Sequence, residues 1–213
     1  MSEKENAPPG PVARTRRDEV RRRLLDAAAR VFAERGYADS RLEDIARAAG
    51  FTKGAVYSNF GGKEDLFGAI LRERSDTELT TVMAEVGDAD DPAEAIGRAA
   101  RVVAGRIAGD AERARLGLEF AARAARDDAT REVVAPLRRA QRDAAARSIA
   151  DVAERTGTRP AVDPDLAALI VHCLTNGLSM ERLADPEAVT ADTAERALTT
   201  VLTALLAPRP DDG

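Results

Sequence analysis

Residues 42–67 read LEDIARAAGFTKGAVYSNFGGKEDLF, and this stretch holds the clearest local structural signals in the chain. Apolar residues recur at helical spacing up to Ala49, and Gly50 can take the left-handed conformation that ends a helix. Thr52 is placed to cap a second short helix that runs to about Asn59. Two short helices joined by a glycine-containing turn predict a helix-turn-helix.

The second short helix carries small and polar residues on its outward side. Gly54 and Ala55 are short enough to let the helix enter a major groove, and Ala55 can meet a thymine methyl group. For Tyr57, a competing interpretation packs the ring in the core and leaves only the hydroxyl outside. The positions that can face DNA are Thr52, Lys53, Gly54, Ala55, Tyr57, Ser58 and Asn59.

Helices are predicted on both sides of this stretch. A first helix near residues 15–35 opens with a capping box formed by Thr15 and Asp18. A second capping box joins Ser40 to Glu43 before the short helices begin. Further helices are predicted at 63–86, 92–108, 111–126, 130–156, 164–184 and 190–206. Because no stretch alternates between apolar and polar residues with a period of two, the fold class is all-α.

Composition limits the classes of function. The chain has 213 residues, of which 44% are hydrophobic and 32% charged, as in globular helical proteins. The single cysteine, Cys173, excludes an intrachain disulfide, and the single histidine, His172, leaves neither a zinc site nor a Ser-His-Asp set. We therefore expect no catalytic residue, metal site or cofactor, and an enzyme is the least favoured class. The longest uncharged stretch is too short to span a membrane and the N-terminus lacks a secretory signal, so we expect a cytoplasmic protein.

Charge is distributed unevenly along the chain. Residues 1–63 hold 13 basic against 9 acidic residues, whereas residues 64–213 hold 19 against 28. The arginines between Arg14 and Arg23 suit contacts with DNA phosphates, because each such cation releases condensed counterions. A solvated helix face is the alternative interpretation of the same run.

The region from about Arg17 to Arg72 resembles the TetR, or tetracycline-repressor-like, family of transcriptional regulators. The residues that carry the resemblance are Ile45, Ala46, Ala49, Gly50, Phe51, Thr52, Lys53, Gly54, Tyr57, Phe60, Lys63, Glu64 and Leu66. The family often has His where Asn59 stands and Ser where Gly62 stands. The resemblance implies about nine helices: a three-helix DNA-binding domain at 14–62 and a helical effector-binding and dimerisation domain at 63–207, between a disordered arm (1–13) and a tail (208–213).

The resemblance also assigns DNA contacts. It implies that Thr52, Lys53, Gly54, Ala55 and Tyr57 approach bases or the adjoining backbone, and that Ser40, Arg41, Tyr57, Asn59 and Lys63 grip phosphates. Arg14, Arg16 and Arg17 would enter a flanking minor groove, as in some family members.

Residues 166–180 carry no charge, so a helix there is expected to be buried on more than one side. One face can pack on its own domain, and the other suits a close two-fold contact; family members usually dimerise through their last two helices. The predicted interface is Leu166, Ile170, His172, Cys173, Asn176, Gly177, Ser179, Leu198, Val201, Leu202 and Leu205. A two-fold dimer predicts a near-palindromic operator with half-sites about 34 to 36 Å apart, although some relatives space them more widely.

Family members also bind a small molecule in the helical body, and the bound form loses operator affinity. The candidate pocket residues are Phe67, Leu71, Val103, Ile107, Leu116, Glu119, Phe120, Val134 and His172. Core packing is the alternative role for the apolar ones, a helical salt bridge for Glu119 and a hydrogen bond for His172. Because a single aromatic residue follows residue 67, an aromatic cage for a flat cation is not expected, which favours an aliphatic or acyl effector.

The sequence thus predicts a homodimeric, sequence-specific DNA-binding regulator, most simply a repressor that a small-molecule effector releases from double-stranded DNA. The alternative is a helical ligand-binding or scaffold protein with non-specific or lost DNA binding. Lys63 and the arginine-rich run at 14–23 count against that alternative.

Overall fold

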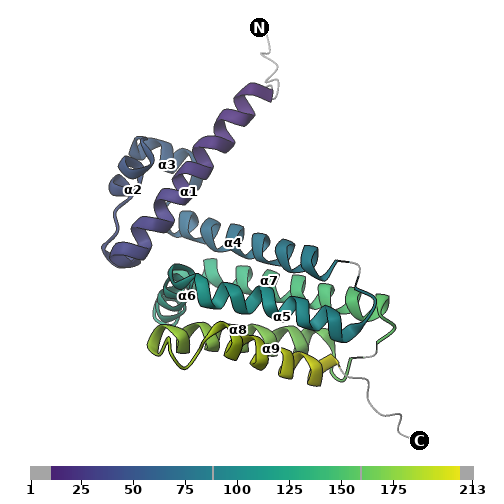
Figure 1. Ribbon diagram of the computed structural model, residues 1–213. Coiled ribbons are helices and arrows are strands. Elements are labelled where there is room, and N and C mark those ends of the chain that lie inside the picture. The colour runs from purple at the N-terminus through teal and green to yellow at the C-terminus, as the bar shows by residue number, and fades with distance from the viewer. Residues whose placement is uncertain (1–10, 88, 159, 207–213) are drawn as a thin grey trace, which may run out of the picture. The chain divides into compact units, whose positions relative to one another are not determined.

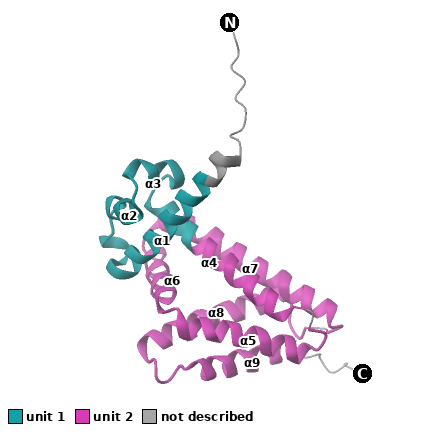
Figure 2. Cartoon of the chain, turned by 45° about the horizontal axis from the view of Figure 1, so that its top comes forward, with its two compact units in different colours: residues 1–70 teal, residues 71–213 magenta. Residues whose placement is uncertain are grey.

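The computed structural model describes residues 11–87, 89–158 and 160–206, and in these ranges its regular structure is entirely α-helical (Figure 1). The helices are α1 (Pro11–Asp39), α2 (Leu42–Ala49), α3 (Lys53–Phe60), α4 (Lys63–Val86), α5 (Pro92–Gly109), α6 (Ala111–Ala124), α7 (Asp128–Arg155), α8 (Pro164–Ala184) and α9 (Ala191–Leu206). The predicted all-α class is confirmed. The chain divides into two compact units, Met1–Ile70 and Leu71–Gly213, and the division falls inside α4 (Figure 2).

Aspartate caps set the starts of four helices. At the start of α5, the Asp91 carboxylate accepts a hydrogen bond of 3.1 Å from the backbone N–H of Glu94, and a proline occupies the first turn. Asp110, Asp127 and Asp163 cap α6, α7 and α8 in the same manner. These local signals are why the predicted and observed bounds of α5 to α8 agree to within a few residues.

The first helix differs from its prediction at its start. α1 begins at Pro11, so Thr15 and Asp18 lie inside the helix and the capping box predicted for them is wrong. Of the predicted arm, residues 1–10 lie outside the described ranges and residues 11–13 belong to α1. Gly36 interrupts the helix with a φ of 76°, a conformation that other residues rarely adopt.

Three aromatic rings form the centre of the N-terminal unit. The ring centroids of Phe32, Tyr37 and Phe67 lie 5.3 to 5.5 Å apart, and all three side chains are buried. Such pairs contribute about 0.5–1.5 kcal/mol each beyond the area they bury. Phe67 was predicted to line an effector pocket in the helical body. That prediction is wrong, because the first turns of α4 belong to the N-terminal unit and the ring packs in its core.

In the C-terminal unit, α5 packs along α9 and α7 along α8 (Figure 1). Small side chains such as Ala100, Ala104 and Ala194 let α5 and α9 approach closely, and Ile107 and Leu198 fill the space beside them. Leu198 is only 1% exposed, so it packs within its own chain and its predicted place in a dimer interface is wrong. Within the described ranges, none of the helices combines the length and the apolar character that crossing a bilayer requires.

Candidate functional site

The turn between α2 and α3 fixes the crossing of the two short helices. Gly50 adopts the left-handed conformation with φ 76°, and its N–H donates to carbonyls of the last turn of α2. The backbone N–H of Phe51 then donates to the carbonyl of Ala46 at 2.8 Å, which completes the helix C-terminus. A side chain at position 50 would also come within 3.1 Å of the Arg23 guanidinium. The turn therefore needs glycine, as the sequence predicted.

α3 buries one side and exposes the other. Val56 and Phe60 are buried, whereas Thr52, Lys53, Gly54, Tyr57 and Ser58 are exposed and Ala55 and Asn59 are half-buried. Tyr57 is 49% exposed, so its ring does not pack in the core and the competing interpretation for it is wrong. Thr52 occupies the N-cap position without forming a side-chain cap. Five of the seven residues predicted to face DNA are thus exposed, and Ala55 and Asn59 are partly covered.

An ion pair crosses this face. The Lys53 ammonium lies 2.5 Å from a carboxylate oxygen of Glu43 on α2 and 5.6 Å from the ring centroid of Tyr57. The hydrogen bond from Lys53 lowers the pKa of Glu43 below its usual value, and the same bond raises the pKa of Lys53. Both groups keep their charges near neutral pH. The only basic side chain of α3 is therefore held by an acid of the neighbouring helix.

The side chains predicted to contact phosphates differ in their exposure and in the hydrogen bonds that they already form. Arg41 is exposed at the N-cap position of α2. The Lys63 ammonium lies 4.3 Å above the ring of Tyr37 and donates to the carbonyl of Ala38 at 3.3 Å. The side-chain amide of Asn59 donates to the carbonyl of Ala55 at 2.7 Å. Lys63 and Asn59 thus each already donate a hydrogen bond within the N-terminal unit, whereas Arg41 is exposed.

Ser40 is excluded from DNA contact by its burial. Its side chain is 2% exposed, and its hydroxyl donates to the carbonyls of Gly36 at 2.6 Å and Val31 at 3.3 Å. The predicted phosphate contact is therefore wrong, and so is the capping box with Glu43, because the hydroxyl points into α1. Ser40 closes the helix end that Gly36 interrupts.

The arginine run on α1 divides into two groups. Arg21 donates to the carbonyl of Asn59 at 3.0 Å and lies over the ring of Phe60, and Arg23 donates to the carbonyl of Ala49 at 3.0 Å. Each guanidinium thus meets the C-terminal carbonyls of a short helix, where positive charge is favoured. Arg16 and Arg17 are exposed, and the side chain of Arg14 lies outside the described residues. Arg21 and Arg23 therefore hold the motif together, a role that sequence spacing did not reveal.

α8 exposes an apolar stripe in the C-terminal unit. Leu166, Leu169 and Met180 are 43%, 43% and 45% exposed, and Cys173 and Asn176 between them are also exposed. The intervals are alternately three and four residues, the spacing by which a helix presents one seam to a partner helix. Of the predicted interface residues, Leu166, Cys173 and Asn176 lie on this stripe. Leu169 and Met180 were not among the predicted interface residues.

His172 lies beside the stripe, against α7. Its Nε2 is 3.0 Å from a guanidinium nitrogen of Arg138. Burial, and then the charges of Arg138 and Arg142, lower the pKa of His172 to about 4. The ring is therefore neutral at pH 7 and accepts a hydrogen bond from Arg138, which matches the hydrogen-bonding alternative for this residue.

Ion pairs tie α4 to the two following helices. The Glu78 carboxylate of α4 pairs with Arg106 of α5 at 2.6 Å and also with Arg113 of α6. Arg74 of α4 pairs with Glu112 of α6, and Arg113 donates to the Arg74 carbonyl at 2.8 Å. Desolvation lowers the pKa of Arg113 from its usual value. No local sequence pattern predicts this network, because the partners in α4 and α6 lie 35 to 39 residues apart in the sequence.

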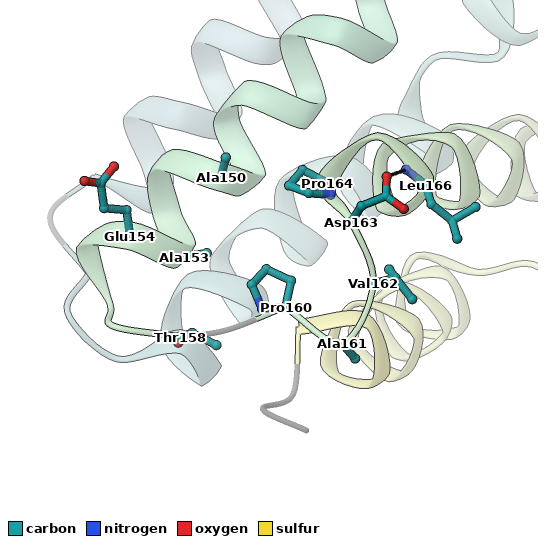
Figure 3. A pocket seen from close by; sticks show the side chains of 10 residues that line it. All are labelled: Ala150, Ala153, Glu154, Thr158, Pro160, Ala161, Val162, Asp163, Pro164 and Leu166. Carbon is teal, nitrogen blue, oxygen red and sulfur yellow. Dashed lines mark hydrogen bonds between the residues drawn. The ribbon is translucent and has the colours of Figure 1, made fainter. Parts of the chain in front are cut away.

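The predicted effector residues line neither of the two hollows described for the C-terminal unit. Leu116, Phe120 and Val134 are buried, and Ile107 and Val103 pack in the core beside α9. The first hollow is an apolar cavity between α4, α5, α7 and α9. The second is an open groove at the connection from α7 to α8 (Figure 3).

Two family models match the chain. Residues 24–70 match "Bacterial regulatory proteins, tetR family", and residues 92–207, more than half of the chain, match "BetI-type transcriptional repressor, C-terminal". The first match covers the motif of α2 and α3, and the second covers α5 to α9.

Curated relatives match mainly around the same motif. The HTH-type transcriptional regulator SrpR of Pseudomonas putida is 47% identical over 57 residues, which are 27% of each chain. The HTH-type transcriptional repressor DhaR of Mycobacterium sp. (strain GP1) is 37% identical over 76 residues, 36% of this chain and 38% of DhaR. The matches thus span well under half the length of these relatives.

Solved structures match over nearly the whole fold. A TetR-family regulator from Rhodococcus sp. superposes with a TM-score of 0.76 at 24% identity, over 89% of this chain and all of that one. FadR from Bacillus subtilis, solved in complex with stearoyl-CoA, gives 0.70 at 18% identity over 86% and 98% of the two chains. A regulator from Saccharomonospora viridis in complex with choline gives 0.68 at 21% identity over 90% and 100%. At these identities the likeness establishes the fold.

Proposed function

Because the chain belongs to the TetR family of transcriptional regulators, we propose that it is a dimeric, sequence-specific DNA-binding repressor that a small molecule releases from its operator. The observation that supports the proposal is the exposed surface of α3, where Lys53, Gly54, Tyr57 and Ser58 are accessible on a helix anchored by Val56 and Phe60.

Base contacts are proposed for the N-terminal half of α3. Thr52 and Lys53 offer polar groups, Gly54 permits close approach, and Ala55 offers a methyl surface for thymine. Tyr57 and Ser58 lie one turn later and can reach the adjoining backbone. In this proposal, these residues determine which DNA sequence the protein prefers.

Phosphate contacts are proposed for groups around this helix. Arg41, Asn59 and Lys63 flank α3, and Arg16 and Arg17 extend the basic surface along α1. Arg14 is proposed to reach a flanking minor groove. Each contact adds affinity that falls with salt, because it displaces counterions without reading sequence.

A second copy of the chain is proposed to cover the α8 stripe. Leu166, Leu169 and Met180 leave apolar surface in water at helix-packing intervals, and a two-fold contact would bury the same surface on both copies. α9 contributes its outward side, including Val201. Two α3 helices in a dimer then read two half-sites related by a dyad.

Release by an effector requires a connection from the C-terminal unit to α3. α4 provides a continuous helix from one unit into the other, and the ion pairs of Glu78 and Arg74 fix its middle to α5 and α6. An effector that favours a different arrangement of these helices would reduce operator affinity by about 5 to 150-fold. An aliphatic or acyl effector is proposed. The stearoyl-CoA and choline complexes of two structural neighbours are examples of ligands in this fold.

A footprint on a bound duplex tests the dimeric arrangement. On a site recovered by selection with the purified protein, hydroxyl-radical cleavage should be suppressed in two tracts related by a dyad, with centres about 10 base pairs or a somewhat larger spacing apart. A single protected tract would contradict the proposed dimer.

A further inference from the structure

The apolar cavity of the C-terminal unit has the position of a regulatory site. It has a volume of about 90 Å³, several times the roughly 10–15 Å³ that a single water needs. Val82, Met83 and Val86 bring α4 into its wall, and Ile96, Ile149 and Leu202 bring α5, α7 and α9. A molecule in this space would therefore touch the helix that continues into the DNA-binding unit.

The lining of the cavity selects against charge. Its described walls carry no acidic, basic or aromatic side chain, and their polar side chains are three hydroxyls. Ser148 donates to the carbonyl of Ala144 at 3.1 Å, and Thr156 donates to the carbonyl of Val152 at 2.9 Å. The third hydroxyl, of Thr158, lies 2.9 Å from that of Thr156. A carboxylate or ammonium buried here would lose its hydration without gaining a partner.

The open groove beside the cavity offers a way in. It has a volume of about 650 Å³ and shares Ala153 and Thr158 with the cavity wall (Figure 3). Its described lining includes the carboxylates of Glu154 and Asp163 and no basic side chain. Asp163 already accepts the backbone N–H of Leu166 at 2.9 Å. An anionic ligand would therefore pass two like charges before it reached an uncharged space.

We infer that the cavity binds a neutral aliphatic molecule, and that acids and quaternary ammonium compounds do not bind there. The inference rests on the proposed effector-controlled function and specifies the chemistry of its effector. The absence of charged and aromatic side chains in the described walls separates this site from one for choline, which needs an aromatic or acidic surround, and from one for a fatty carboxylate.

Calorimetry with three probes tests the inference on the full chain. We expect 1-hexanol to bind at least tenfold more tightly than hexanoate or choline. Ala99→Leu, which places a larger side chain in the cavity wall, should weaken hexanol binding tenfold or more, whereas Ala93→Leu on the exposed side of α5 should leave it unchanged. Ile96→Ala enlarges the space and should shift the preference toward 1-octanol. Thermal unfolding checks that each variant is folded.

Two results would overturn the inference: tighter binding of hexanoate or choline than of hexanol, or hexanol binding that neither cavity variant alters. Because binding is measured without DNA, the outcome is independent of operator recognition. Hexanol binding with no sequence-specific DNA binding would leave the cavity assignment intact and refute the proposed function. Specific DNA binding with no hexanol binding would refute the cavity assignment and leave the proposed DNA-binding function intact.

Discussion

The Lys53 ammonium lies 2.5 Å from a carboxylate oxygen of Glu43, so the base at the start of α3 is paired with an acid from α2. Both side chains are about half exposed, on the face proposed to meet DNA. In solution the pair contributes little to stability, as exposed pairs generally do. Close to phosphates, however, the carboxylate opposes binding and competes with a base for the Lys53 ammonium.

Replacement of Glu43 should therefore strengthen DNA binding. We expect Glu43→Gln to raise affinity several-fold for matched and mismatched duplexes alike, because it removes a negative charge near the phosphates. Fluorescence anisotropy at several salt concentrations measures both affinities. Glu132→Gln, at an exposed position of α7, makes the same change in net charge and should not change DNA affinity. Equal behaviour of the two variants would show that Glu43 does not face DNA.

Lys63 and Ala55 should separate affinity from specificity. Lys63→Ala should weaken binding to all duplexes and reduce the slope of log affinity against log salt by about one, since one phosphate contact is lost. Ala55→Ser should change which base pair is preferred and leave the slope unaltered. Competition binding on matched and singly mismatched duplexes distinguishes the effects. If both variants acted alike on matched and mismatched sites, the assignment of base and phosphate contacts would be wrong.

The α8 stripe should hold the dimer together. Leu169→Asp places a charge where two copies are proposed to meet, and it should convert the dimer to monomers at micromolar concentration. Sedimentation equilibrium measures the association. Leu118 on α6 is 45% exposed against 43% for Leu169, so Leu118→Asp is a matched control that should remain dimeric. Loss of the dimer in both variants, or in neither, would place the interface elsewhere.

His172 should make folding stability depend on pH. Its pKa falls from an ordinary value near 6.5 to about 4 in the folded protein, so the unfolded chain binds more protons between these values. Stability should therefore decline as pH falls from about 6.5 towards 4. We expect the loss between pH 7 and pH 5 to be about 1–2 kcal/mol larger than in His172→Gln, after allowance for partial solvent screening.

Urea unfolding at a fixed protein concentration measures this difference, and the glutamine variant serves as the reference because its side chain can still accept from Arg138. Carboxylates that titrate in the same range contribute equally to both proteins and cancel. Identical pH profiles would show that burial and the charges of Arg138 and Arg142 do not hold the imidazole neutral.

Features that depend on neighbours in sequence could be predicted, and features that depend on distant partners could not. Asp91 starts α5 and Gly50 ends α2 because a cap acts within four residues. Ser40 and Glu43 also have the local sequence pattern of a helix cap, but the Ser40 hydroxyl donates to a carbonyl of α1 instead. Arg21 reaches a carbonyl 38 residues away, which no spacing rule shows.

The C-terminal unit shows the same limit at its surfaces. Residues 166–180 were correctly assigned to a helix, but the pattern could not tell which side packs inward, and Leu169, which is exposed, was not predicted to face a partner. Leu198 has the periodicity of an interface residue and lies in the core. A helix with apolar residues on two faces carries no local signal for which face is covered, because that depends on how α5, α7 and α9 surround it.

Selection of duplexes from a random library with the purified protein near 0.15 M salt tests whether the chain is a sequence-specific dimeric regulator. Basic charge alone binds DNA without choosing a sequence, so enrichment of a motif requires base contacts from α3. We predict recovery of a near-palindrome whose half-sites are lost together when Lys53 is changed. Salt-sensitive binding with no enriched sequence would contradict specific regulation and favour a helical ligand-binding or scaffold protein.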